Sequence, residues 1–335
     1  MKRNVLLSLA TLAALTGTAA AENVELRMAT LAPTGSRWEK TLTEGGTQIA
    51  KATENRVTVK YYADAGQGDE RDYIRKINAG QLDGAAVTSV GLAMIDPSIK
   101  VLELPMMFET IEEMDYVRKK MWKHFQKKFE KKGFQLGEPG DVGWIYFLSK
   151  NKVSALKDLK NQKVWMWADD AVVKAMYSKL GVSGVPLGVP EVEANLTAGK
   201  INACYGPPLA AMTLGWTPPK IKYMTSMPMA YSIGATVIKL DALKKLSQDD
   251  FKKVEKITKK ISKGLMKAVR KDNTESQKQM KRKGVTVVDT PADMIADFRT
   301  AAESVWKELA GKVYSQAELD DVLKYRDEFR AKSKK

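Results

Sequence analysis

Cysteine and histidine are almost missing from this sequence, which has one of each, Cys204 and His124, among 335 residues. A single cysteine cannot form a disulfide within the chain, so packing must hold the fold together. Zinc clusters and histidine-based catalytic triads are nearly excluded for the same reason. His124 lies among lysines in KKMWKHFQKKF, which is typical of a solvated surface residue, and Cys204 is most simply a small buried strand residue. Paired carboxylates, a glycine-rich phosphate loop and a nucleophile elbow are also absent, so we expect no enzyme, no metal and no cofactor.

Long apolar runs are scarce as well. The run at 5–15 follows two basic residues, precedes three alanines at 19–21 and is too short to span a bilayer. This layout is typical of a secretory signal peptide and not of a membrane helix. We therefore expect residues 1–21 to be a signal peptide and the mature chain to begin at Glu22 in the periplasm.

Positive charge is in excess, with 55 Lys and Arg against 40 Asp and Glu. Loss of Lys2 and Arg3 with the signal peptide lowers the formal net charge from +15 to +13. Such an excess favours solubility and a weak attraction to acidic partners, such as lipid headgroups or acidic faces of membrane proteins. The basic residues are not interleaved with aromatic ones in a nucleic-acid-binding motif, so we expect no nucleic-acid partner.

Two copies of one folding unit are visible in the apolar periodicity and in the helix start and stop signals. The first copy has predicted strands at 24–32, 57–65 and 81–90 with helices at 35–55 and 69–80. The second has predicted strands at 163–167, 183–188 and 200–206 with helices at 169–181 and 190–199. Each β-α-β-α-β unit implies a mainly parallel, doubly wound sheet, and two such lobes leave a cleft at the carboxyl ends of their strands.

A return strand and one very long helix complete the predicted architecture. The strand at 232–240 goes back to the first lobe, and helical spacing then runs from Ser247 to about 283. At 1.5 Å per residue this helix is about 55 Å long, more than one lobe needs, so it must span both lobes. The predicted division is residues 22–143 plus 231–271 in lobe I and residues 144–230 plus 272–335 in lobe II.

Several motifs, in this order and spacing, resemble one family over nearly the whole mature chain. They include GDERDYIRKINAGQLDGAAVTSVGL, PSIKVLELPMMF, LKDLKNQKVWMW and LTAGKINACYGPPLAA. The sequence resembles the extracytoplasmic solute-binding proteins of TRAP transporters, the DctP family. The resemblance implies a two-lobed α/β periplasmic binding protein of type II-like architecture. It also implies capture of a small-molecule solute and docking on a membrane permease with small and large subunits.

The chain departs from the family pattern at the positions that hold the ligand. Where the family carries a carboxylate-binding arginine, this chain has Trp165, and Ile145 occupies a second frequent arginine position. In the motif GKINACYGP, Asn202, Tyr205 and Gly206 replace an acid, a glutamate and a ligand-contacting asparagine. An indole cannot form the two-point ionic contact that a guanidinium makes with a carboxylate, and an unpaired buried anion is costly. We therefore predict an apolar or aromatic ligand, and not a C4-dicarboxylate or a sialic acid.

Each candidate also has a structural alternative. Trp165 and Trp167 could be core residues, Trp144 could pack at the hinge, Trp216 could close a helix end, and Glu70 could be an exposed acid at a helix N-terminus. Tyr205 is expected in the cleft wall beside the turn GPP. The predicted ligand-binding set is Trp165, Trp167, Tyr205, Trp144, Ile145, Gly206, Glu70 and Trp216.

A second kind of function stays open at this level. The chain could be a periplasmic carrier of a lipid-like ligand, or of a cationic ligand held in an aromatic cage, that works with another envelope transport or efflux system. Genes that encode small and large multi-span membrane proteins next to this one would favour the TRAP transporter.

Overall fold

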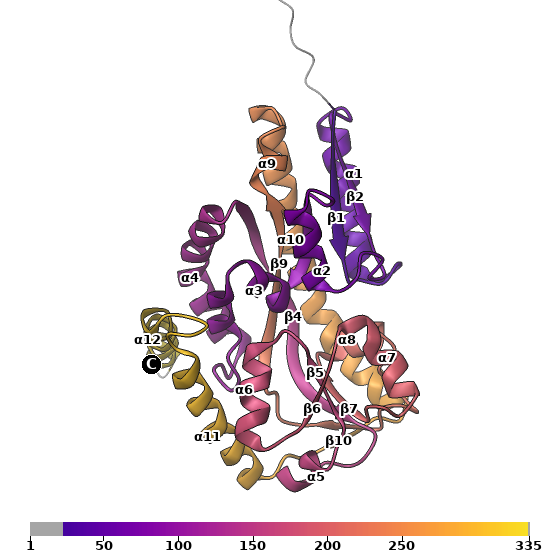
Figure 1. The fold of residues 1–335 in the computed structure, drawn as a ribbon, viewed down its shortest axis with the longest axis vertical. Coiled ribbons are helices and arrows are strands. Elements are labelled where there is room, and N and C mark those ends of the chain that lie inside the picture. Colours follow the sequence, from indigo (N-terminus) through magenta and orange to yellow (C-terminus); the bar gives the residue numbers. More distant parts are fainter. Residues whose placement is uncertain (1–22, 334–335) are drawn as a thin grey trace, which may run out of the picture.

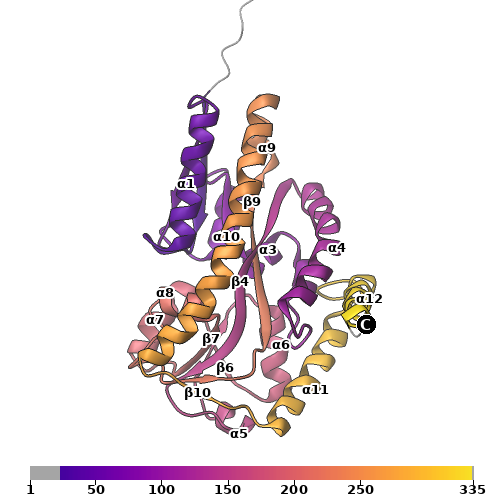
Figure 2. The ribbon, with the colours of Figure 1, turned by 180° about the vertical axis from the view of Figure 1, so that it is seen from behind.

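The computed structural model describes residues 23–333, so the predicted signal peptide lies outside the described residues. Two lobes lie one above the other along the long axis of the molecule (Figure 1). One long helix and two long strands run between them (Figures 1 and 2). The fold is the predicted two-lobed α/β architecture, and its sheet is mixed, with parallel pairs in both lobes.

The first predicted β-α-β-α-β unit is confirmed in the upper lobe of Figure 1. Strand β1 lies between β2 and β3 and is parallel to both. The carboxylate of Asp69 caps α2 by accepting a hydrogen bond from the amide of Glu70, so the acids at the start of this helix meet its positive end. The elements are β1 (Val24–Thr30), α1 (Arg37–Ala52), β2 (Val57–Tyr62), α2 (Glu70–Asn78) and β3 (Gly84–Thr88).

The second unit repeats the arrangement in the lower lobe. Strand β5 lies between β6 and β7 and is parallel to both, as β1 lies between β2 and β3. Helix α6 begins after the cap Asp170 and ends at Gly181, whose left-handed φ of 65° suits a residue without a Cβ. The elements are β5 (Val164–Trp167), α6 (Ala171–Leu180), β6 (Gly184–Leu187), α7 (Val189–Thr197) and β7 (Ala203–Gly206).

Two strands that cross the molecule join the lobes into one sheet. Strands β4 (Phe134–Ser149) and β9 (Ala230–Lys239) pair antiparallel along most of their length. On its other edge, β9 pairs with β3 in the upper lobe. Past its pairing with β9, β4 pairs with β7 in the lower lobe. The sheet therefore runs in the order β2-β1-β3-β9-β4-β7-β5-β6, so the two predicted sheets are continuous.

Helix α10 (Gln248–Arg282) confirms the predicted long helix. Its 35 residues span about 52 Å at 1.5 Å per residue. The hydroxyl oxygen of Ser247 accepts a hydrogen bond from the amide of Asp250 at 3.1 Å and so caps the first turn. The helix contacts α1 in the upper lobe, β4 in the middle and α8 (Pro208–Thr213) in the lower lobe, as Figure 2 shows.

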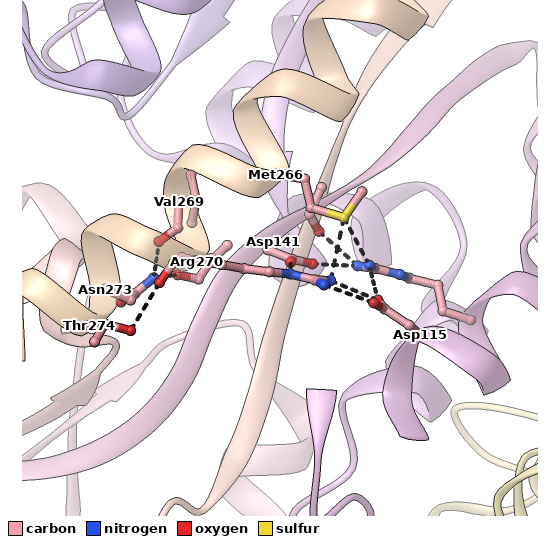
Figure 3. A network of polar contacts seen from close by, with 10 residues as sticks. Asp115, Asp141, Met266, Val269, Arg270, Asn273 and Thr274 are labelled. Carbon is pink, nitrogen blue, oxygen red and sulfur yellow. Dashed lines mark hydrogen bonds and ion pairs between the residues drawn. The ribbon is translucent and has the colours of Figure 1, made fainter. Parts of the chain in front are cut away.

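A partly buried ion network fixes α10 to β4 and to helix α4 (Ile111–Lys131). Arg270 on α10 pairs with Asp141 on β4 and with Asp115 on α4 (Figure 3). Arg118 donates to the same two carboxylates, at 2.6 Å to Asp141 and 2.7 Å to Asp115. Two arginines and two carboxylates balance in charge, so the buried side chains of Arg118 and Asp141 have ionic partners.

The middle of β4 has an irregular backbone beside α10. Its register against β9 shifts between Asp141 and Gly143, and Gly143 has a φ of 130°. The side-chain nitrogen of Asn273 donates to the Val142 carbonyl at 2.8 Å. Its side-chain oxygen accepts from the backbone amide of Leu209 at 3.1 Å, so Asn273 links α10 to β4 and to α8. A Cβ on Gly143 would lie 2.6 Å from the Asn273 nitrogen, so only glycine fits there. The lobe boundary expected at 143–144 falls at this point, and the lobe division stays a prediction.

The remaining elements cover the two lobes. None of the helices within residues 23–333 is both long and apolar enough to cross a membrane. Helix α12 contacts α4 and η1, which belong to the range expected for lobe I, whereas α11 contacts α6 of the second unit. These elements are α3 (Ser89–Ile95), η1 (Pro97–Glu103), α5 (Leu156–Lys160), β8 (Tyr223–Thr225), α9 (Leu240–Leu243), β10 (Thr286–Val288), α11 (Ala292–Leu309) and α12 (Gln316–Ser333).

Candidate functional site

A cavity of about 280 Å³ lies between the two lobes. Its wall includes Thr30, Thr88, Trp167 and Gly206, which are the last residues of β1, β3, β5 and β7. Ligand sites of open α/β sheets form at the carboxyl ends of the strands, and both units supply theirs here. Residues of α10 close the cavity on another side.

Four aromatic rings of the lower lobe, Trp165, Trp167, Tyr205 and Trp216, form one cluster in the cavity wall, here called the aromatic cluster. The ring of Trp165 stacks on Tyr205, with 4.6 Å between centroids and 16° between planes. Trp216 meets Trp165 edge-on at 5.4 Å, and Trp167 lies 5.9 Å from it. The pair of tryptophans in KVWMW thus shares one face of β5, as the period of a strand requires.

Hydrogen bonds fix the orientation of this cluster. The indole nitrogen of Trp165 donates to the Leu187 carbonyl at 3.0 Å, and the hydroxyl of Tyr177 donates to the Trp165 carbonyl at 3.1 Å. The backbone amide of Trp167 donates to the Tyr205 hydroxyl at 3.1 Å. Trp165 is only 2% exposed. It is therefore a packed core residue and part of the cavity wall at once.

Gly206 leaves room for Trp216. A Cβ at position 206 would lie 3.2 Å from Cζ3 of that indole, which is a tight contact. The ring of Trp216 therefore occupies the space that a side chain on residue 206 would need. The Trp216 indole nitrogen is buried and, within the described chain, has no hydrogen-bond partner. A buried donor without a partner is costly unless a bound molecule supplies an acceptor.

Trp167 also connects the two lobes. Its indole nitrogen donates to Oδ2 of Asp69 at 2.9 Å, from the end of β5 to the cap of α2. Both side chains are buried, and burial raises the pKa of Asp69, against the opposite effect of the hydrogen bonds that it accepts.

Glu70 is buried in the cavity wall, so it is not the solvent-exposed acid of the structural alternative. It accepts hydrogen bonds from the amide and the hydroxyl of Thr88, at 2.8 and 2.9 Å, and from the amide of Gly91 at 2.7 Å. Burial raises its pKa to about 8 despite these donors. The carboxyl group is therefore largely neutral at pH 7.

A buried charged group, here called the lysine triad, lines the cavity near the aromatic cluster and consists of Lys100, Glu103 and Asp170. The Lys100 ammonium donates to Asp170 at 2.8 Å, to Glu103 at 3.2 Å and to the Ser89 hydroxyl at 3.0 Å. Although burial opposes it, the pKa of Lys100 stays above its usual value because both carboxylates stabilise the charge. Among the cavity-lining residues of the described chain, Lys100 is the one cationic side chain, and there is no arginine. All three of its donors are already used.

The profile of the family described as bacterial extracellular solute-binding protein, family 7 (DctP), matches residues 28–312. The chain belongs to the DctP family. Proteins of this family bind solutes outside the cytoplasm and are not enzymes, in agreement with the sequence-based expectation.

Solved structures share the fold of this DctP protein at low sequence identity. The sugar-acid-binding protein of Advenella mimigardefordensis, in complex with galactonate, is 18% identical, with a TM-score of 0.85 over 92% of this chain and 99% of the other. A TRAP solute-binding protein of Citrobacter koseri with bound D-glucuronate is 22% identical, with a TM-score of 0.81 over 89% and 98% of the two chains. A third, from Desulfovibrio salexigens with bound orotic acid, is 17% identical, with a TM-score of 0.82 over 92% and 99%.

Two curated relatives align over a shorter stretch. The protein YiiZ of Salmonella typhimurium is 26% identical over 46% of this chain and 48% of its own length. A solute-binding protein of Chromohalobacter salexigens is 27% identical over 49% of each chain. The alignment thus spans about half the length of these relatives.

The structure places Trp144 differently from the other candidates of this DctP protein. Ile145 lines the cavity, whereas Trp144 is not among the lining residues of the described chain. Its ring packs edge-on against Tyr231 of β9, with 4.9 Å between centroids and 87° between planes. Neighbouring residues of a strand point to opposite faces, so β4 sends only one of the two into the cavity. This packing favours the hinge alternative for Trp144, and its contact with a ligand stays a prediction.

Sequence reasoning missed several residues of the wall. Lys100 and Glu103 stand in the otherwise apolar run SIKVLELP, and charged residues in such a run are a signal of a buried ionic site. Asp170 lies in the predicted helix 169–181, and the local pattern there assigns it no role in the site. Trp38 on α1 and Met266 on α10 also line the cavity, within segments for which the sequence predicts only a helix.

Metal binding has no support in the described part of the chain, residues 23–333. No three His, Cys, Asp or Glu side chains there are arranged to hold an ion. Cys204 is buried, and burial raises the pKa of its thiol, so it is a poor nucleophile.

Proposed function

We propose that this DctP protein captures a largely apolar or aromatic solute in the cavity between its lobes and delivers it to a TRAP-type membrane permease. One observation carries the proposal. Lys100 is the one cationic side chain in the described wall, and its ammonium already donates to three partners within the protein. A carboxylate ligand would have to enter without a free cationic partner.

The energies favour the apolar ligand. A buried anion without a partner costs several kcal/mol, which binding would have to offset. Burial of apolar surface contributes about 25 cal/mol per Å², so ~300 Å² of ligand and wall could supply roughly 7 kcal/mol before ordering costs. The aromatic cluster supplies such surface, together with the apolar wall residues Val172, Met176 and Leu265. This term approaches the ~8.2 kcal/mol that corresponds to a dissociation constant of 1 μM, so apolar burial can supply most of the gross binding energy without an ion pair.

The proposed ligand differs in class from the molecules named with the solved neighbours. Galactonate, D-glucuronate and orotic acid are the molecules named with those structures, and each carries an acidic group. At identities of 17 to 22% the likeness concerns the fold. The predicted loss of the family arginine at Trp165 and at Ile145 is the proposed reason for a different ligand.

Calorimetry on ligand-stripped protein tests the ligand class. We expect neutral aromatic probes of increasing size, namely phenol, indole and N-phenylnaphthylamine, to bind at one site, with at least one probe in the micromolar range. Galactonate and D-glucuronate should give no heat under the same conditions. Tight binding of either acid, or of succinate or a sialic acid, would reject the proposal.

Delivery to a permease is the second part of the proposal. It is supported by membership of a family of extracellular solute-binding proteins. If the adjacent genes encode small and large multi-span membrane subunits, deletion of either should abolish uptake of the solute while the binding protein still binds it. Unchanged uptake in such a strain, or an efflux pump as the genetic neighbour, would instead favour the envelope-carrier alternative.

A further inference from the structure

The lysine triad carries an uncompensated negative charge. It contains one ammonium, on Lys100, and two carboxylates, on Glu103 and Asp170, and all three residues are at most 7% exposed. No second cationic side chain lines the cavity in the described chain. The other ion network nearby, around Asp141, has as many arginines as carboxylates and therefore cannot supply the missing charge.

Backbone dipoles stabilise this charge without balancing it. Oδ1 of Asp170 accepts from the amides of Val172 and Val173 at the start of α6, and Oε2 of Glu103 accepts from the amide of Ile233 at 2.9 Å. The oxygens that face Lys100 each accept one described hydrogen bond, from its ammonium. An ionised carboxylate has about four acceptor positions, so both groups can accept further hydrogen bonds.

The triad lies next to the aromatic cluster. The backbone amide of Asp170 donates to the Trp167 carbonyl at 3.1 Å, and the backbone amide of Trp167 donates to the Tyr205 hydroxyl at 3.1 Å. The charges of Asp170 and Glu103 add to the effect of burial, which raises the pKa of this hydroxyl. The negative charge and the stacked rings of Trp165 and Tyr205 therefore belong to one end of the same cavity.

An unpartnered donor in the same wall points to a bound molecule independently. The indole nitrogen of Trp216 is buried without a described partner, although the side chain is only 2% exposed. Native proteins seldom leave such a donor unused, so a ligand that carries an acceptor atom would satisfy it.

We propose that the ligand carries a cationic amine or ammonium head, which Glu103 and Asp170 bind, and an apolar body, which lies on the aromatic cluster. A cation brings the charge of the triad to zero, whereas an anion would double the imbalance. An acceptor atom elsewhere in the ligand pairs with Trp216. This inference rests on the proposed apolar cavity and adds the chemistry of the head group.

Matched probes test the charge preference by calorimetry. Three series of unbranched alkyl and phenylalkyl chains of increasing length carry an amine, an alcohol or a carboxylate at the same position. At the best chain length we expect the amine to bind about tenfold or more tightly than the alcohol, because a hydrogen bond to a charged group is stronger than a neutral one. The carboxylate should bind most weakly.

Two variants connect the preference to the triad. Asp170→Asn keeps a side chain that can cap α6 but removes one charge, and Glu103→Gln removes the other. In each variant the amine should lose most of its advantage over the alcohol, which should fall below about threefold. Asp250→Asn is the control, because Asp250 is a buried aspartate paired with Arg56 near the start of α10, outside the cavity. It should keep the wild-type preference.

The outcomes separate this inference from the proposed function. If at no chain length the amine binds more tightly than the alcohol, the cationic head is rejected while the apolar cavity stands. If the carboxylate series binds most tightly, both are rejected. An amine preference that survives in both triad variants would also overturn the assignment of the head group to Glu103 and Asp170.

Discussion

The indole nitrogen of Trp167 donates a hydrogen bond to the carboxylate of Asp69 at 2.9 Å, from the second β-α-β-α-β unit to the first. Lys100 of η1, in the range expected for lobe I, makes another buried contact with Asp170 of the second unit, at 2.8 Å. Residues of the chain itself therefore hold the lobes together at the cavity. Such contacts stabilise this arrangement of the lobes, here called closed, relative to one in which the lobes are further apart, before any solute is bound.

Trp167→Phe removes the first of these contacts and keeps an aromatic ring. We expect the free energy of unfolding to fall by about 1–3 kcal/mol, because the buried Asp69 carboxylate loses a donor. We also expect a larger radius of gyration in small-angle X-ray scattering, since the open arrangement becomes more populated.

Trp122→Phe is the matched control for this change. The Trp122 indole nitrogen donates to the Gly137 carbonyl at 2.9 Å, between α4 and β4, and Trp122 does not line the cavity. It should lose stability without any change in the radius of gyration. Equal radii for the two variants would show that the contact between Trp167 and Asp69 does not hold the lobes together.

Trp165→Ala tests the role of the stacked indole in the wall. Removal of a large buried aromatic side chain costs about 3–5 kcal/mol of folding stability, so the variant should unfold at lower urea concentration. Below that concentration, its affinity for the best aromatic probe should fall at least about tenfold. Phe125→Ala removes a fully buried ring of α4 that is not part of the cavity wall, and should lower stability without a loss of affinity. Comparable affinity losses in both variants would point to general loosening instead.

Glu70 predicts a pH dependence of stability. Its folded-state pKa of about 8 lies above the ordinary value of 4.5, so the folded protein retains a proton that the unfolded chain has lost. Stability should therefore fall as pH rises from about 4.5 to 8, by at most about 1.4 kcal/mol per pH unit from this group. Urea denaturation of wild type and Glu70→Gln at several pH values isolates the effect, since the variant lacks this slope.

Glu318 supplies a control with the opposite sign. Burial would raise its pKa, but hydrogen bonds from Lys128 and His124 lower it to about 2. Its contribution is complete above its ordinary pKa of 4.5 and is lost only as pH falls towards 2. The comparison for Glu318→Gln is made in a His124→Gln background, which removes the imidazole paired with this carboxylate. Between pH 5 and 8 that difference should be constant, whereas the difference between wild type and Glu70→Gln should change with pH. A constant difference for Glu70→Gln would contradict the raised pKa.

We predict that any replacement of Gly143, at the irregular point of β4, destabilises the fold. Its φ of 130° is unfavourable for any residue with a Cβ, and that atom would collide with Asn273. Gly143→Ala should lower the free energy of unfolding by about 1–3 kcal/mol in urea denaturation. Gly264→Ala is the control within α10, because no atom lies within 4 Å of its added Cβ. That variant should gain roughly 0.5–1 kcal/mol from helix propensity, and a loss there would contradict the packing described for α10.

The sequence predicted the two repeated units because each strand and helix carries its own local signal. Apolar residues mark the strands, Asp69 and Ser247 begin helices, and Gly181 ends one. These signals depend on neighbouring residues only, and they also led to the correct length of α10.

Strand β4 is an element that the local sequence pattern does not predict. Its sequence FQLGEPGDVGWIYFLS has three glycines and a proline, which argue against a central strand. The structure accommodates them at two shifts in the register against β9, at Leu136–Pro139 and at Asp141–Gly143. Pairing with a distant strand overrides local preference there, so the continuity of the sheet was not predictable.

The cavity wall was predictable only in part, for a similar reason. Trp165, Tyr205 and Gly206 were located through the resemblance to a family and through the place of strand ends. Lys100 and Asp170 lie 70 positions apart in the chain and form their ion pair only when the lobes come together. No local pattern contains such a pair, so the charge balance of the cavity appeared only in the structure.

The most direct test is mass spectrometry of the molecule that co-purifies with this protein from its native host, released with organic solvent. The account predicts a small molecule with an apolar or aromatic body and no free carboxylate, present in native protein and depleted from the Trp165→Ala variant. A sugar acid, a dicarboxylate or another organic anion bound in stoichiometric amount would contradict it.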